Sequence, residues 1–130
     1  MEIVFHHVGC VVRSIPESVE AYRLMTRSVS ETKYIAAQDI RACFIEIAPG
    51  SYIELIEPAS NDSVVSQLLQ KRVSYYHTGY LVRDFEAALE ELTSCGHRHL
   101  NTFQSESFGL RNCAFLVSPV AHLIEIIQAE

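Results

Sequence analysis

Two histidines and two glutamates stand at matched positions in the two halves of this chain. His7 matches His77 and Glu54 matches Glu125, each inside an apolar segment typical of a strand. A carboxylate with apolar neighbours on both sides is costly to bury unless it is paired or bound to a cation. Two imidazoles and two carboxylates form a ligand set that suits a divalent ion such as Zn, Co, Ni, Mn or Fe(II). The sequence therefore predicts one metal site built from these side chains.

The positions match because the chain contains an internal repeat. Residues 7–22 align with residues 77–92, and residues 41–57 align with residues 112–128. Similar apolar residues fill the same places in both copies, and Gly9 is matched by Gly79. If the two copies are related by an approximate two-fold axis, equivalent residues approach that axis in pairs. The repeat thus gives a reason for the paired ligands to meet at one point.

Each copy has the pattern of a strand, a helix and three more strands. Alternating β-branched and apolar residues predict the first strands over residues 3–12 and 76–82. Ser14 and Asp84 are the expected N-caps of the two helices. Shorter strands are predicted after the helices, over residues 31–36, 41–47, 51–57, 98–104, 112–117 and 121–128. The expected fold is α+β: two tandem βαβββ units that form a half-open, mostly antiparallel, barrel-like sheet.

A connector joins the two units. We expect residues 1–58 to form the first unit, residues 59–74 a connector helix and residues 75–130 the second unit. Leu68 and Leu69 lie on one side of the short helix, which makes the connector ordered rather than flexible. The two units are therefore expected to pack together as one compact domain.

Composition excludes several classes of function. The chain has 130 residues, is 48% hydrophobic and has a formal net charge of −6. Such a chain buries enough surface to fold without a metal, so a metal site would serve function. The acidic balance argues against a nucleic-acid partner, and no apolar run approaches the ~18 residues of a membrane span. No basic region precedes the first apolar residues, so we expect a cytoplasmic protein whose partner is a small molecule.

His6 competes with His7 for the role of ligand. Adjacent side chains on a strand point to opposite faces, so we expect His6 to face away from the metal site. Its repeat partner is Tyr76 rather than a histidine, which favours the same choice.

A tandem βαβββ fold with these paired ligands resembles the vicinal oxygen chelate superfamily, which includes glyoxalases, extradiol dioxygenases and bleomycin-resistance proteins. Within it the sequence is most similar to the methylmalonyl-CoA epimerases. The likeness extends over essentially the whole chain and includes His7-Val8-Gly9, Ile53-Glu54-Leu55-Ile56-Glu57-Pro58, His77-Thr78-Gly79 and Leu123-Ile124-Glu125-Ile126.

The resemblance implies an enzyme. It would be a divalent-metal-dependent isomerase or lyase that acts on a carbonyl or acyl-CoA thioester through an enolate-type intermediate. Glu125 would be both ligand and catalytic base. Ala42 aligns with an epimerase position that holds a second acid, and Glu46, on the same strand face, could replace that acid as a catalytic residue. Ala42, Phe44 and Tyr52 would line the substrate-binding face, and the site could form within one chain or across a homodimer.

Two other functions stay open at the level of sequence. One is a glyoxalase-type metal lyase, which would act on a thiol hemiacetal. The other is a non-catalytic protein of the resistance type, which would bind a small hydrophobic molecule without a stoichiometric metal. The full ligand set favours the enzymes over the binding protein.

Overall fold

The computed structural model describes residues 2–130, and its strands form one curved sheet. The strand order is β2-β4-β5-β1-β6-β9-β8-β7, and β3 also pairs with β4. The strands are β1 Ile3–Val11, β2 Ser28–Val29, β3 Lys33–Ile35, β4 Ile40–Ala48, β5 Ser51–Pro58, β6 Tyr75–Val82, β7 Arg98–Ser105, β8 Arg111–Val117 and β9 Leu123–Gln128. This arrangement confirms the α+β prediction of a mostly antiparallel sheet.

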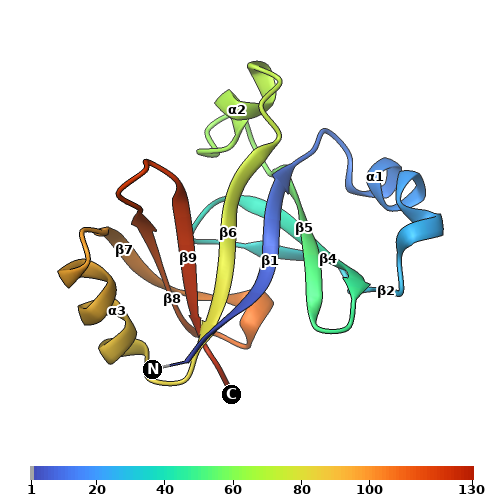
Figure 1. Ribbon diagram of the computed structural model, residues 1–130. Coiled ribbons are helices and arrows are strands. Elements are labelled where there is room, and N and C mark those ends of the chain that lie inside the picture. Colours follow the sequence, from blue (N-terminus) through green and yellow to red (C-terminus); the bar gives the residue numbers. More distant parts are fainter. Residues whose placement is uncertain (1) are drawn as a thin grey trace.

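The centre of the sheet has the expected two-fold character. β1 and β6, the first strands of the two repeats, run antiparallel side by side (Figure 1). β5 pairs with β1 in parallel, and β9 pairs with β6 in the same way. Equivalent strands therefore face each other across the β1–β6 pair, which is where paired ligands can meet.

The helices lie outside the sheet, with α1 and α3 on opposite flanks (Figure 1). They are α1 Ile15–Ala21, α2 Ser66–Gln70 and α3 Phe85–Ser94, with short 3₁₀ turns at η1 Arg23–Met25 and η2 Glu106–Phe108. As predicted, the side chains of Ser14 and Asp84 cap α1 and α3 by accepting backbone N–H groups. No helix within residues 2–130 has the length and apolarity to cross a membrane.

Apolar packing fixes each helix to its half of the sheet. Ile15 of α1 packs with Ile45 and Leu55 of β4 and β5. Phe85 of α3 packs with Leu116 of β8 and with the neighbouring strand β9. Each fully buried side chain of this size contributes roughly 1.5–3 kcal/mol. The outer face of the sheet is thus held by helices, and the inner face is left for the site.

The strand predicted over residues 31–36 forms only over Lys33–Ile35, as β3, and a short strand that was not predicted, β2 Ser28–Val29, precedes it. Ser30 lies between them, and its Oγ accepts the backbone N–H of Phe44 at 2.9 Å. A side chain thus takes the place of a main-chain partner, which interrupts the ladder.

The last strand begins two residues later than predicted, at Leu123. Ala121 has a φ of 66°, and the Oγ of Ser118 accepts the backbone N–H groups of Val120 and His122. These contacts form a tight turn, so residues 121 and 122 are outside the strand.

Candidate metal centre

The structure brings the four predicted ligands together within a single chain. The Nε2 atoms of His7 and His77 are 2.9 Å apart. Each Nε2 lies 3.3 Å from Oε1 of Glu54 and 3.3 Å from Oε1 of Glu125. Two nitrogens and two oxygens therefore point at one small volume on the inner face of the sheet.

Two glycines make room for this arrangement. Gly79 of β6 pairs with His7 of β1 on one side and with Glu125 of β9 on the other. A Cβ at Gly79 would stand 2.0 Å from Cε1 of His7, and a Cβ at Gly9 would stand 2.5 Å from Cε1 of His77. Each imidazole therefore lies across the facing glycine, which explains why the repeat has glycine at both positions.

Burial makes the charges of the site strongly interdependent. The four residues are at most 5% exposed. Burial alone would lower the pKa of His7, but the carboxylates of Glu54 and Glu125 outweigh it and raise the pKa to about 9. The pKa of His77 is raised in the same way. Burial would raise the pKa values of both glutamates, yet the two imidazoles hold them well below the ordinary range.

The four side chains fit a divalent cation. Bonds of about 2.0–2.2 Å from such an ion to nitrogen and oxygen ligands leave neighbouring ligand atoms roughly 3 Å apart, as they are here. Within residues 2–130, the buried Oε1 of Glu54 has no hydrogen-bond partner. A buried acceptor without a donor is costly, and a cation would satisfy it. Two positive charges would also balance the two buried carboxylates.

We expect the binding of Zn²⁺ at pH 7 to release at least one proton, because the pKa values of His7 and His77 are both raised. The pKa of His7 is about 9 without a metal, whereas a histidine ligand must be neutral. Calorimetric titration in two buffers of different ionisation enthalpy measures the number released. Affinity should rise with pH by at least about tenfold per unit and level off only above pH 9, where His7 has lost its proton. A release of zero at pH 7 would contradict this charge distribution.

His6 does not face away from the site, contrary to the prediction. Its Nδ1 lies 2.9 Å from Nδ1 of His7, and its ring stacks on Tyr52 with centroids 4.6 Å apart. The cause is a β-bulge: Phe5 pairs with Tyr80 and His7 pairs with Gly79, so His6 is an extra residue in β1. A bulge breaks the alternation of faces and re-aims a side chain.

Aromatic rings enclose His7. The ring of Phe44 contacts it edge-on at 5.2 Å between centroids, and that of Phe108 lies at 6.3 Å. Phe44 was predicted to line the inner face together with Tyr52. Phe108 of η2 was missed, because a residue in a short turn of the second unit has no sequence pattern that points to a site in the first.

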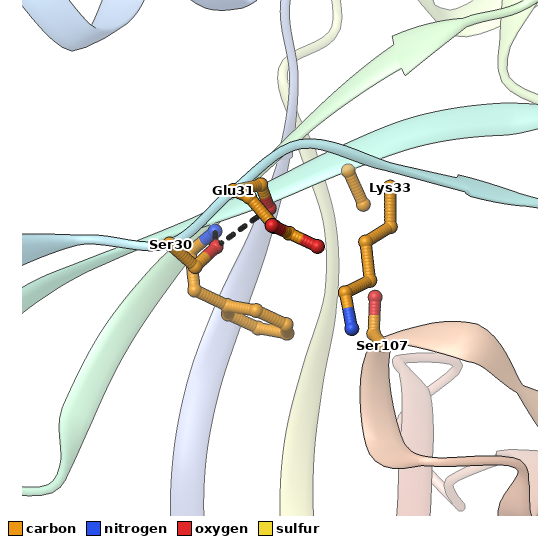
Figure 2. A pocket seen from close by; sticks show the side chains of 6 residues that line it. Ser30, Glu31, Lys33 and Ser107 are labelled. Atoms are coloured by element: carbon orange, nitrogen blue, oxygen red, sulfur yellow. Dashed lines mark hydrogen bonds between the residues drawn. The ribbon is translucent and has the colours of Figure 1, made fainter.

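A pocket of about 220 Å³ opens beside Phe44 and is lined also by Ser30, Glu31, Lys33, Ala42 and Ser107. Figure 2 shows the side chains of Glu31 and Lys33 within this pocket, with that of Ser107 opposite. Ala42, whose place on a substrate-binding face stays a prediction, is part of this lining. Its small side chain leaves space there rather than a carboxylate.

Glu46 lies outside the four-residue group. Its two carboxylate oxygens accept hydrogen bonds from Oγ of Ser28 and from the backbone N–H of Gly50. These contacts hold Glu46 at the turn between β4 and β5. Its role as a second acid stays a prediction.

The comparisons with known proteins agree with this geometry. The profile of the Glyoxalase/Bleomycin resistance protein/Dioxygenase superfamily matches residues 6–115. The chain belongs to this superfamily. No curated protein matches the sequence. The resemblance inferred from the repeat and the ligand pattern is thus confirmed at the level of the superfamily.

Several solved structures have the same fold. A hypothetical protein from Bacillus halodurans is 25% identical with a TM-score of 0.87, covering 100% of this chain and 96% of its own. A methylmalonyl-CoA epimerase from Mycobacterium tuberculosis is 22% identical with a TM-score of 0.84, and the match covers 98% of this chain and 88% of the epimerase. A variant of the Streptomyces coelicolor methylmalonyl-CoA epimerase, in complex with 2-nitronate-propionyl-CoA, is 25% identical with a TM-score of 0.83. The match covers 98% of this chain and 99% of the variant.

Proposed function

We propose that this protein is a divalent-metal-dependent isomerase that moves a proton at the carbon next to the carbonyl of an acyl-CoA thioester, as a methylmalonyl-CoA epimerase does. One observation supports this most: two imidazoles and two carboxylates of one chain converge in a buried site. A divalent ion bound there would act as a Lewis acid on the carbonyl group. The superfamily and the 25% identity to an epimerase with an acyl-CoA analogue favour this substrate class.

The chain's own groups supply the remaining parts of the reaction. Glu125 is the proposed base that would take the proton, the role that the family resemblance implies for this position, and it lies beside the other three ligands. His7, His77 and Glu54 would hold the ion in place. The rings of Phe44 and Phe108 exclude water beside His7. Exclusion of water strengthens electrostatic stabilisation of a developing negative charge.

The pocket beside Phe44 is the proposed route of the substrate to the ion. Lys33 and Glu31 at this pocket offer opposite charges, and Ser30 and Ser107 offer hydroxyl groups. A substrate with a polar acyl group can be oriented by such a lining. The ring of Phe44 lines this pocket and also contacts the imidazole of His7, so it borders the proposed route.

Exchange of the α-proton with deuterated water tests the function. We expect the metal-loaded protein to incorporate deuterium into methylmalonyl-CoA faster than the uncatalysed reaction. A chelator should stop the exchange and added Co²⁺ or Zn²⁺ should restore it. The Glu125→Gln variant should lose roughly 10²- to 10⁴-fold in rate, the usual contribution of a positioned base. The readout is the mass or proton spectrum of the recovered thioester.

A control separates the base from general damage to the fold. Glu90 is exposed on α3, on the outside of the sheet, so Glu90→Gln should exchange protons like the parent. If the metal-loaded parent catalyses no exchange, the proposed isomerase activity on this thioester is wrong.

A further inference from the structure

We infer that His6 is a positioning residue of the metal centre: it accepts a hydrogen bond from Nδ1 of His7 and so leaves Nε2 of His7 free to bind the ion. The inference rests on the proposed metal-dependent function and names a residue of that same site. It starts from a contact that strand alternation did not predict, the 2.9 Å approach between the two Nδ1 atoms.

The hydrogen bond has only one direction that is compatible with a metal ion. Of two facing Nδ1 atoms, one must donate and the other must accept. A ligand nitrogen offers a lone pair, so a histidine that binds through Nε2 has its hydrogen on Nδ1. His7 points Nε2 at the other ligand atoms. Nδ1 of His7 therefore donates, and Nδ1 of His6 accepts.

The surroundings hold the His6 ring in the accepting position. It stacks on Tyr52 with 4.6 Å between centroids and an angle of 28°. Phe44 and Phe108 contact it edge-on, with centroids 5.4 and 5.5 Å away. The bulge in β1 turns His6 toward these rings. A ring packed on three sides cannot swing away, so it can fix the orientation of its neighbour.

Among the described residues, the second unit has no equivalent of the hydrogen bond between His6 and His7. Tyr76 takes the place of His6 next to His77 and contacts it through ring edges, with centroids 4.9 Å apart. Nδ1 of His77 has no hydrogen-bond partner among the described residues. The two histidine ligands are therefore held differently, and His7 is the one whose nitrogen is selected by a neighbour.

Metal affinity of three variants tests the inference. His6→Phe keeps a ring but removes the acceptor, and it should weaken Zn²⁺ binding by about 10- to 100-fold, the usual effect of losing an outer hydrogen bond to a ligand. His6→Asn places an amide oxygen near the original Nδ1, so it should retain affinity within about threefold. Tyr76→Phe is the matched control from the other repeat and should bind like the parent. Competition with a chromophoric chelator measures all of these affinities.

The outcomes are distinguishable from failure of the proposed function. If the parent binds no divalent ion, the metal-dependent function fails and this inference fails with it. If the parent binds and His6→Phe binds equally well, or if His6→Asn loses as much as His6→Phe, only the inference is overturned. Nitrogen-15 spectra of the zinc-loaded parent give a second test that needs no variant. They should place the hydrogen of the His7 ring on Nδ1, and finding it on Nε2 would overturn the inference.

Discussion

Purified protein is expected to contain about one divalent ion per chain, and the Glu125→Ala variant is expected to contain almost none. Loss of a ligand should weaken binding by more than about 100-fold, because even the outer partners of ligands are worth about 10- to 100-fold. The variant also leaves Glu54 and two imidazoles in a buried space without the second carboxylate. Elemental analysis of both proteins after identical purification measures the difference.

Thermal unfolding should show the same loss of metal binding in the Glu125→Ala variant. At a free-ion concentration 100 times Kd, binding stabilises the folded parent by about 2.7 kcal/mol, or on the order of 10 °C in Tm for a chain of this size. Added ion should not raise the Tm of Glu125→Ala. The Glu90→Ala variant removes a carboxylate from the exposed face of α3 and should respond like the parent. A parent that purifies without metal and gains no stability from any of the candidate ions would contradict the metal centre itself.

The repeat explains why so much of the site could be predicted from sequence. A polar residue that recurs at the same place in both copies, inside a strand, needs a reason other than packing. Two such pairs were present, and the antiparallel pairing of β1 with β6 brings them together. The helix caps at Ser14 and Asp84 were equally visible, since capping depends on residues a few positions apart.

The remaining features depend on geometry that a linear pattern does not contain. His6 was placed on the wrong face because alternation assumes an even ladder, and one extra residue in β1 breaks that assumption. Phe108 reaches His7 from a turn in the other unit, far away in sequence. The strand predicted over residues 31–36 is limited to Lys33–Ile35, and Ser30, just before it, accepts a backbone hydrogen bond from Phe44 of β4. The error at His6 thus arises from a local irregularity in the strand, whereas Phe108 was missed because its contact with His7 is long-range.

Replacing Gly79 with alanine is expected to destabilise the metal-free protein and to abolish metal binding. The new Cβ would lie 2.0 Å from Cε1 of His7 and 2.5 Å from its Nδ1. His7 is fully buried, and its Nδ1 is held by His6, so the imidazole has little space to move. Overpacking of this kind costs about 1–3 kcal/mol. A loss of stability in Gly79→Ala would point to the clash with His7, because alanine in a strand is ordinarily more stable than glycine by roughly 0.5–1 kcal/mol.

Urea unfolding of the metal-free proteins and Zn²⁺ titration of the folded ones measure both effects. Gly109→Ala is the control: Gly109 has a φ of 60° and nothing within 4 Å of the added Cβ. It should cost roughly 1–2 kcal/mol for the left-handed backbone and leave metal affinity unchanged. The double variant His7→Ala with Gly79→Ala should recover stability relative to Gly79→Ala alone, because the Cβ then enters the space of the missing imidazole. Additive effects in this cycle, or a Gly79→Ala protein that binds zinc like the parent, would mean that the glycine does not make room for the ligand.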